Sequence, residues 1–193
     1  MPSFNKFKKK YVVKVPKDIK VLYCDKKNIL TFIGPFQKKS LKLQIKIFLL
    51  SESTLIVTNL PTFEVSSMNI KNVIKLQGTT AAKIRQAIIE TFYTLYHRLN
   101  FVGVGYRVFP YDGFENQLYF KLGYSHLIYF KIPSNIRTHC QKFTKLFIFG
   151  NDSLDNLTQV SAQIRLCKLP EPYKGKGILH THEKISLKKG KKI

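Results

Sequence analysis

The end of the chain alternates lysine with glycine beside a single aromatic residue. Residues 169–178 read LPEPYKGKGI, and further lysines follow. Two prolines separated by one residue oppose a helix, because each lacks an amide N–H and restricts the residue before it. Glycine lets a backbone approach a partner closely, and the lysine ammonium is a point charge suited to phosphate. The pattern therefore predicts an irregular strip that binds a polyanion.

This strip has too few apolar residues to build a core of its own. From Lys168 onward, eight lysines stand against two acids, Glu171 and Glu183. We expect such a segment to be mobile in the free protein and to become ordered on an anionic partner. A solvated, disordered tail is the alternative. The tail residues expected to contact the partner are Tyr173, Lys174, Gly175, Lys176, Gly177, Lys184, Lys188, Lys189, Lys191 and Lys192.

The whole chain is strongly basic. Its 193 residues carry 33 Lys and Arg against 11 Asp and Glu, a formal net charge of +22. This imbalance favours a nucleic acid or an anionic membrane surface as the partner. Hydrophobic residues make up 44%, which is enough for a folded core and excludes a wholly disordered basic protein. The three cysteines are far apart and odd in number, so the sequence contains neither a disulfide framework nor a zinc spacing.

Motifs for catalysis and nucleotide binding are incomplete. Gly103-x-Gly105 has Val108 where a dinucleotide fingerprint needs its third glycine. Ser125 beside His126 lacks the closing glycine of a nucleophile elbow, and the tail lacks phosphate-loop spacing. The 11 acids form no evident acid–base pair. We therefore predict no catalytic residue, and an RNA contact or a simple turn at Ser125 and His126.

Histidines in the tail permit one metal site to be drawn. His180 and His182 could combine with Cys140 and Cys167, but no periodicity places these four residues on one face. We therefore predict neither a metal nor another cofactor. A membrane span is not predicted either, because no apolar run approaches the roughly 18–20 residues that it needs.

Apolar periodicity predicts strands in the first half of the chain and then a helix. Residues 19–23, 29–33, 41–48 and 55–58 read as strands, and residues 41–48 show the alternation of a sheet with one wet face. Residues 59–77 read as irregular. A helix capped by Thr79 or Thr80 follows, because apolar residues between 81 and 99 recur at spacings of three and four.

The second half repeats the order of the first. Residues 28–34 resemble 116–123, residues 41–47 resemble 127–132, and residues 55–57 resemble 146–148. Each block ends in a predicted helix, the second capped by Asp152 or Ser153. We therefore predict an α+β fold of two similar domains, each an antiparallel sheet with a helix packed on one face, plus the irregular basic tail. The expected boundaries are 1–99 for the first domain, 100–170 for the second and 171–193 for the tail.

The stretch PEPYKGKGI at residues 170–178 resembles the signature of the bacterial-type sixth ribosomal protein of the large subunit. Residues 102–107 (VGVGYR) and 122–126 (LGYSH) are similar to two further motifs of that family. Gly78-Thr79-Thr80 is similar to the start of its first-domain helix. The matching motifs run from Gly78 to Lys192, and before Gly78 only the layout agrees. The two halves of the family's proteins are structural duplicates, in agreement with the repeat.

The resemblance implies a structural rRNA-binding protein that supports translation without catalysis or a cofactor. It implies large-subunit rRNA near the stalk base and the factor-binding region as the binding site. Neighbouring ribosomal proteins and nearby translation factors are the other implied partners, with no small-molecule substrate. In the second-domain motifs, the residues expected to contact RNA are Arg107, Tyr124, Ser125 and His126. Leu179 and His180 stand where the family usually carries an arginine and an aromatic residue, so an arginine–phosphate contact is not expected there.

Two further expectations concern location and the competing function. The N-terminal region is unlike an import signal, because the first arginine of the chain is Arg85. Together with the lysine excess, this predicts a mitochondrial ribosome with the gene inside the organelle. A plastid or the bacterial cytoplasm is the alternative location.

The alternative function is a peripheral module that binds an anionic membrane through the tail. Such binding uses an amphipathic basic helix, which Pro170, Pro172, Gly175 and Gly177 oppose, so no membrane partner is expected.

Overall fold

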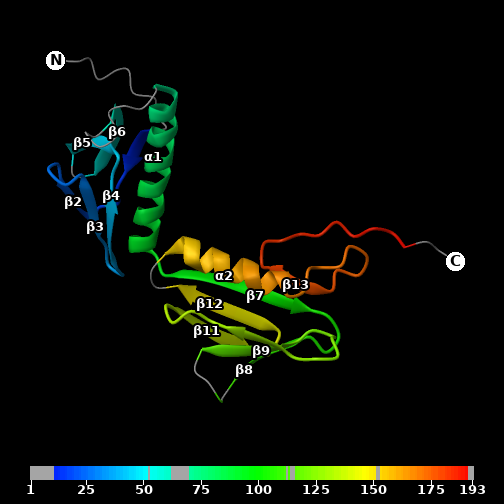
Figure 1. Ribbon diagram of the computed structural model, residues 1–193. Coiled ribbons are helices and arrows are strands. Elements are labelled where there is room, and N and C mark those ends of the chain that lie inside the picture. The colour runs from blue at the N-terminus through cyan, green and yellow to red at the C-terminus, as the bar shows by residue number, and fades with distance from the viewer. Residues whose placement is uncertain are drawn as a thin grey trace. The chain divides into compact units, whose positions relative to one another are not determined.

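The chain forms two compact units, Met1–Tyr93 and Thr94–Ile193. The computed structural model describes residues 11–51, 53–61, 70–111, 113, 116–150 and 153–190. The N-terminal lysines, and Lys191 and Lys192 of the predicted tail, lie outside the described residues. Each unit contains antiparallel sheets and one long helix, which confirms the predicted α+β class (Figure 1).

In its described residues, the first unit has six strands followed by a helix. Its elements are β1 (Val12–Lys14), β2 (Lys20–Cys24), β3 (Ile29–Ile33), β4 (Lys38–Lys42), β5 (Ile45–Ser51), β6 (Thr54–Pro61) and α1 (Ile70–Phe92). They form two three-stranded sheets in the orders β1-β6-β5 and β2-β3-β4. Alternate residues of both sheets, such as Leu30, Ile45 and Leu55, are buried in one core together with Ile84 of α1.

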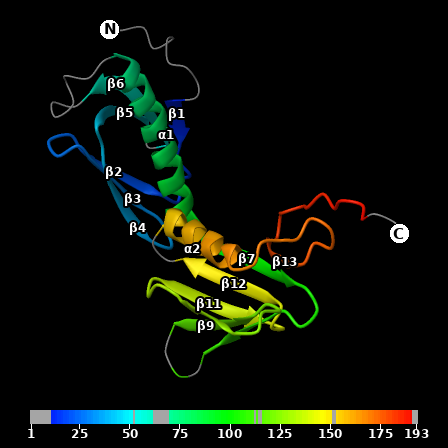
Figure 2. The same ribbon diagram turned by 45° about the vertical axis from the view of Figure 1, so that its right-hand side comes forward.

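The second unit, as far as the structure describes it, repeats this arrangement and adds one strand. Its elements are β7 (Leu95–Val102), β8 (Arg107–Pro110), β9 (Gln117–Lys121), β10 (Ile128–Lys131), β11 (Ile136–Gln141), β12 (Lys145–Gly150), α2 (Leu154–Leu166) and β13 (Gly177–His180). They form a three-stranded sheet, β10-β9-β8, and a four-stranded sheet, β11-β12-β7-β13. Helix α2 lies along one face of the four-stranded sheet (Figure 2).

Equivalent backbone features confirm that the two units are duplicates. Asn28 and Asn116 each precede the middle strand of a three-stranded sheet, and both have positive φ, 50° and 61°. The carbonyl oxygen of Asn28 accepts a 2.8 Å hydrogen bond from the Leu43 amide, and that of Asn116 accepts one of the same length from Ile132. Residues 28–34 and 116–123 therefore occupy equivalent places, as the sequence repeat predicted. The predicted match of residues 41–47 with 127–132 is shifted, because the counterpart of β10 is β4.

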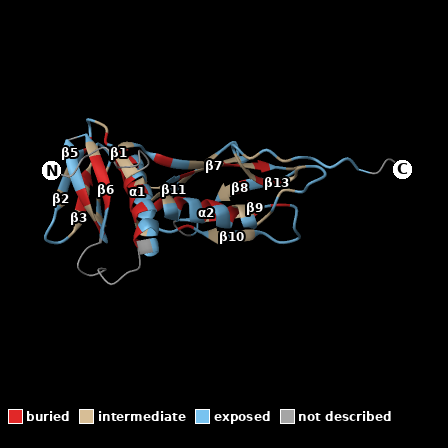
Figure 3. Cartoon of the chain, turned by 90° about the horizontal axis from the view of Figure 1, so that it is seen from above, coloured by how far each residue is buried: buried red, intermediate tan, exposed pale blue. Residues whose placement is uncertain are grey.

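Helix α1 begins earlier and ends earlier than predicted. Thr79 and Thr80 lie inside it rather than at its start, and their hydroxyls donate 3.0 Å hydrogen bonds to the carbonyl oxygens of Leu76 and Gln77. Because the helix already begins at Ile70, the amides after Thr79 and Thr80 bond within it and no cap is needed there. Figure 3 shows that buried and exposed bands alternate along both helices, as expected for helices with one face on a core.

The far end of the predicted helix is a strand. Leu95 and Leu99 are buried on β7, although they continue the apolar stripe of α1. A spacing of four residues returns to the same face in a helix and also in a strand, so the pattern is shared by both structures. The two units therefore divide at Tyr93, and the expected boundary at residue 99 falls within β7.

Two other segments also differ from the sequence-based prediction. The predicted strand of residues 41–48 is two strands, β4 and β5, interrupted at Leu43, whose amide bonds to Asn28. The part of the predicted tail that follows Lys176 is not irregular, because Gly177–His180 forms β13 and pairs antiparallel with β7. Ile178 on this strand is fully buried in the second core. The second unit therefore extends into residues that the sequence assigned to a tail.

Candidate nucleic-acid interface

The lysine–glycine stretch forms a closed loop that leads into β13. The Gly175 amide donates a 2.9 Å hydrogen bond to the carbonyl oxygen of Glu171, and the Glu171 amide donates one of 2.9 Å to Lys176. Farther along, the Lys188 amide donates to the carbonyl oxygen of Pro172 at 2.9 Å. Because both ends of the loop are tied to its own backbone, its lysines extend from a defined support.

The two glycines of this loop have intramolecular reasons to be glycine. Gly175 has a φ of +69°, a conformation that side chains with a Cβ rarely adopt. Gly177 is buried, and a Cβ built there would lie 2.5 Å from Cα of Pro170 and 2.8 Å from the carbonyl oxygen of Leu169. The chain itself therefore fills that space, and an RNA contact at Gly177 stays a prediction.

Tyr124 and two lysines gather beside this loop, around a surface depression of about 500 Å³. The Nζ atom of Lys168 lies 4.0 Å from the centre of the Tyr124 ring, and the Tyr124 hydroxyl donates a 3.3 Å hydrogen bond to the carbonyl oxygen of Cys167. Lys176 lines the same depression. His126 stacks on Tyr124 with ring centres 5.7 Å apart and an interplanar angle of 16°. Cations and stacked rings on adjacent backbones suit a partner with phosphates and bases.

The remaining predicted contact residues in the described part of the chain are spread over the second unit. Ser125 is exposed between Tyr124 and His126, and Tyr173 of the loop is 54% exposed. Arg107 is exposed on β8, directly opposite Lys121 of β9. The structure therefore brings Tyr124, His126 and Lys176 together with Lys168. The sequence analysis had missed Lys168 as a contact residue, although it begins the basic segment. The other predicted tail lysines that the structure describes are also exposed, namely Lys174, Lys184, Lys188 and Lys189.

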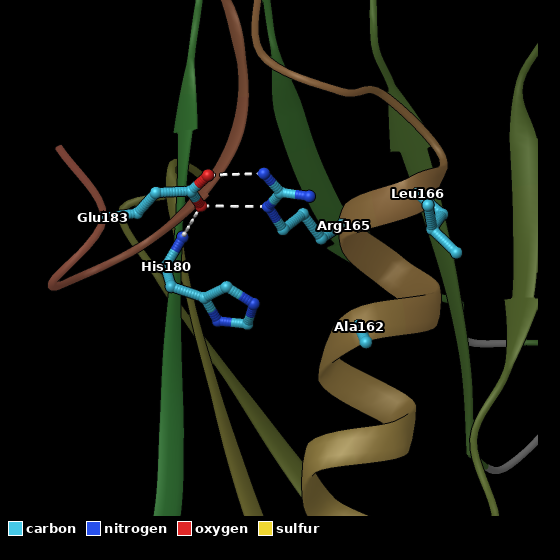
Figure 4. A pocket seen from close by; sticks show the side chains of 5 residues that line it. All are labelled: Ala162, Arg165, Leu166, His180 and Glu183. Atoms are coloured by element: carbon cyan, nitrogen blue, oxygen red, sulfur yellow. Dashed lines mark hydrogen bonds and ion pairs between the residues drawn. The ribbon is translucent and has the colours of Figure 1, made fainter. Parts of the chain in front are cut away.

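An ion pair joins the tail to α2 (Figure 4). Arg165 donates through two nitrogens to the two carboxylate oxygens of Glu183, with Nε at 2.9 Å from Oε2. The amide N–H of His180 donates to the same carboxylate at 3.3 Å. The hydrogen bonds from Arg165, more than any other effect, lower the pKa of Glu183 below its ordinary range. This contact was not predicted from the sequence. The one signal for it was Glu183 itself, a lone acid in the lysine-rich segment after β13.

The ion pair makes a prediction about stability and pH. Because the pKa of Glu183 is lower in the folded state, the carboxylate contributes stability above its unfolded pKa of about 4.3, and loses it as pH falls through the folded pKa. We expect Glu183→Gln to lower the free energy of unfolding by about 0.5–1 kcal/mol at neutral pH. The difference from wild type should shrink as the pH falls through the folded pKa of Glu183, because the wild-type side chain then becomes neutral too. Urea titrations at neutral pH and at a series of acidic pH values measure it, with Glu171→Gln as the matched control; a loss that stayed equal across the series would contradict the prediction.

The residues of the conceivable metal site do not meet. Within the described ranges, no three His, Cys, Asp or Glu side chains are grouped so that they could hold a metal ion. The ring of His180 instead lies edge-on to His97 of β7, with centres 6.1 Å apart. Burial, and to a lesser extent the nearby His180 and His182, lower the pKa of His97. His97 therefore stays neutral to a lower pH than an ordinary histidine.

Neither α1 nor α2, the helices in the part of the chain that the structure describes, is long and apolar enough to cross a membrane. The tail residues from Gly177 to His180 form a strand. The basic segment therefore does not provide, in these residues, the amphipathic helix that the membrane alternative uses.

Comparison with known proteins gives a consistent result. The family model of ribosomal protein L6 matches residues 102–181, which run from the end of β7 through β13. The large ribosomal subunit protein uL6 of Mycoplasmoides gallisepticum is 34% identical over 183 residues, which cover 93% of both chains. That of Mycoplasma genitalium is 34% identical over 175 residues, 89% of both chains. The protein uL6m of Reclinomonas americana is 38% identical over 115 residues, 60% of both chains.

These relatives are structural proteins of the ribosome, not enzymes. The similarity to the mycoplasma proteins extends over almost the whole chain and includes both duplicated units. The signature stretch at residues 170–178, the duplicated α+β fold and these matches all agree. The chain therefore belongs to the ribosomal protein L6 family.

Proposed function

We propose that the protein is a structural constituent of the large ribosomal subunit that binds large-subunit rRNA through its second unit. The carrying observation is the group formed by Tyr124, Lys168 and Lys176 beside a loop closed by its own hydrogen bonds. An ordered backbone reduces the entropy that the lysines lose when they bind phosphates. Lysines would neutralise phosphates and release counterions, while the folded unit supplies the shape that fits the RNA.

The proposed place on the ribosome is the stalk base, close to the factor-binding region. This placement comes from the resemblance of the tail and of residues 102–107 and 122–126 to the family motifs. Neighbouring ribosomal proteins, and translation factors that bind nearby, are the further partners in this proposal. We place the protein in a mitochondrial ribosome, supported by its lysine-rich composition and its similarity to the uL6m protein of Reclinomonas americana. Because the two mycoplasma relatives are bacterial, the bacterial cytoplasm is an alternative location, and a plastid is another.

The rRNA proposal is tested by the salt dependence of binding. Deleting residues 171–193 would also remove β13, so lysine-to-glutamine changes are the cleaner test. The four chosen positions are Lys174, Lys176, Lys188 and Lys189. Lys176 is half-buried and the other three side chains are exposed. Each lost phosphate contact reduces the slope of log affinity against log salt by about 0.7–0.9, so we expect a reduction of about 3. A roughly fourfold rise in salt should then weaken wild type about 50- to 150-fold more than the variant.

A variant with the same change in net charge provides the control. It replaces four exposed lysines of the first unit with glutamine: Lys17, Lys20, Lys26 and Lys38. Titrations use the same fragment of large-subunit rRNA for all three proteins, and this control should keep the wild-type slope. Parallel slopes for wild type and the tail variant would overturn the proposal. Tail-dependent binding to vesicles that contain anionic lipid, together with parallel slopes on RNA, would favour the membrane alternative.

A further inference from the structure

Five aromatic rings cover the face of sheet β10-β9-β8 that points away from the core. Phe109 stacks on Tyr119 with ring centres 5.0 Å apart and an interplanar angle of 15°. Phe143 lies 4.8 Å from Phe109 on one side, and Tyr129 lies 6.4 Å from Tyr119 on the other. Tyr111 stands nearly perpendicular to Tyr119 and Tyr129, at 6.4 and 5.8 Å. We call these five residues the aromatic strip.

The rings leave room beside them for a planar group. A surface depression of about 350 Å³ is lined by Tyr111, Tyr119 and Tyr129 together with Leu127. Ligand sites in proteins have volumes of about 300–1,000 Å³, so the space is sufficient for a nucleobase. Tyr129 lies on the edge strand β10 and is 59% exposed. The strip is therefore accessible from solvent in the second unit.

Positive side chains flank the strip on the same face. Arg107 and Lys121 are exposed and are directly opposite each other in the register of β8 and β9. Like charges at such a pair destabilise a sheet, so pairing stability does not account for them. Lys131 is exposed at the end of β10, two residues after Tyr129 and on the same side of the strand. The described residues of these three strands include no acid. The charge of this face therefore favours an anionic partner.

The first unit shows that the fold does not require aromatic residues here. The equivalence of Asn28 and Asn116 aligns β3 with β9, and the antiparallel registers then align the flanking strands. The three equivalent pairs are Leu22 and Phe109, Thr31 and Tyr119, and Ser40 and Tyr129. The hydroxyl oxygens of Thr31 and Ser40 lie 3.0 Å apart, in hydrogen-bond contact. The same sheet is thus built without aromatic residues at these three positions.

We propose that the aromatic strip is a second RNA-binding surface, which stacks unpaired nucleotides. Aromatic side chains stack on any base, and flanking cations hold the phosphates on either side of the stacked bases. The flanking arginine and lysines favour RNA over a protein partner, because they match a chain of phosphates. The strip carries none of the lysines of the tail loop, so this proposal can succeed or fail independently of the rRNA site at the tail.

The test exchanges strip residues for those that the first unit uses. The double variant Tyr119→Thr, Tyr129→Ser is made in the full chain and titrated with a labelled single-stranded oligoadenylate of about eight nucleotides. We expect its affinity to fall about 10- to 100-fold, because each lost stacking contact weakens binding severalfold or more. The slope of log affinity against log salt should not change, because no phosphate contact is removed. By contrast, the variant with four tail lysines replaced should show a reduced slope of log affinity against log salt when it binds rRNA.

A second readout and two controls complete the experiment. The protein has no tryptophan, so stacking should quench its tyrosine emission when the oligonucleotide saturates wild type. The control Tyr93→Thr, Tyr96→Ser removes two exposed tyrosines outside the strip and should retain affinity. Melting curves check folding, and the edge-strand variant Tyr129→Ser replaces the double variant if that unfolds. Unchanged affinity in a folded variant, or no quenching in wild type, overturns the proposal. Normal RNA binding with loss of the variant from assembled large subunits would assign the strip to a protein partner instead.

Discussion

A chain of residues 94–193 is expected to unfold cooperatively on its own, whereas a chain that starts at residue 100 is expected not to fold. Strand β7 is central in the four-stranded sheet, between β12 and β13, and five of its residues precede residue 100. Leu95 and Leu99 among them are buried in the second core. Removing a buried leucine side chain costs about 2–5 kcal/mol, and the entire stability of a domain is about 5–15 kcal/mol. The shorter chain also loses most of the hydrogen-bonded pairing with β12.

Thermal unfolding of both chains, followed by circular dichroism, checks this prediction. The chain of residues 94–193 should give a sigmoidal transition and dispersed amide resonances, and the shorter chain should give neither. A chain of residues 1–93 tests whether the first core is equally independent. If the chain that starts at residue 100 melted cooperatively, β7 would not be essential and the boundary first expected at residue 99 would be restored.

The sequence was sufficient to predict the duplication and much of each unit. A short apolar run before the turn at Gly34 identified β3 at its observed bounds. Ser153 caps α2 as predicted, accepting a 3.3 Å hydrogen bond from the Asn156 amide. Asp152, the other predicted cap, lies outside the described residues. The start of α1 was missed because Gly78 and two threonines resemble a helix boundary, yet the helix continues through them. Local signals specify an element most securely where its burial is periodic and uninterrupted.

Strand β13 could not be predicted from local pattern. It contains only four residues, starts with Gly177, and follows a lysine–glycine run that is typical of a solvated segment. Its pairing with β7 joins residues far apart in sequence, so no local spacing encodes it. The contact between Lys168 and Tyr124 has the same origin, because α2 separates the two residues along the chain.

The aromatic strip was hidden for another reason. Phe109 and Tyr119 face outward, while Val108 and Phe120, their neighbours in sequence, are fully buried. When both faces of a strand carry large apolar residues, alternation of hydrophobicity vanishes and the sequence does not reveal which face is exposed. Only the register of β8, β9 and β10 distinguishes the two faces.

Gly177 provides the most demanding test of the revised view of the tail. A Cβ at this position would lie 2.5 Å from Cα and 2.7 Å from N of Pro170, in backbone that cannot move away without disturbing the loop. Its φ of +155° is also unfavourable for any residue with a Cβ. Backbone strain and overpacking each cost about 1–3 kcal/mol, so we expect Gly177→Ala to lower the free energy of unfolding by roughly 3–5 kcal/mol.

Two other glycines separate the causes of that loss. Gly105 has a φ of +75° but no heavy atom within 4 Å of a built Cβ, so Gly105→Ala should show the conformational cost alone, about 1 kcal/mol. Gly190 has neither constraint, and Gly190→Ala should leave stability within about 0.5 kcal/mol of wild type. Urea unfolding of the three variants, beside titrations with rRNA, measures both properties. If Gly177→Ala kept its stability but bound rRNA more weakly, the glycine would serve close approach of RNA after all, and β13 would not depend on the contact with Pro170.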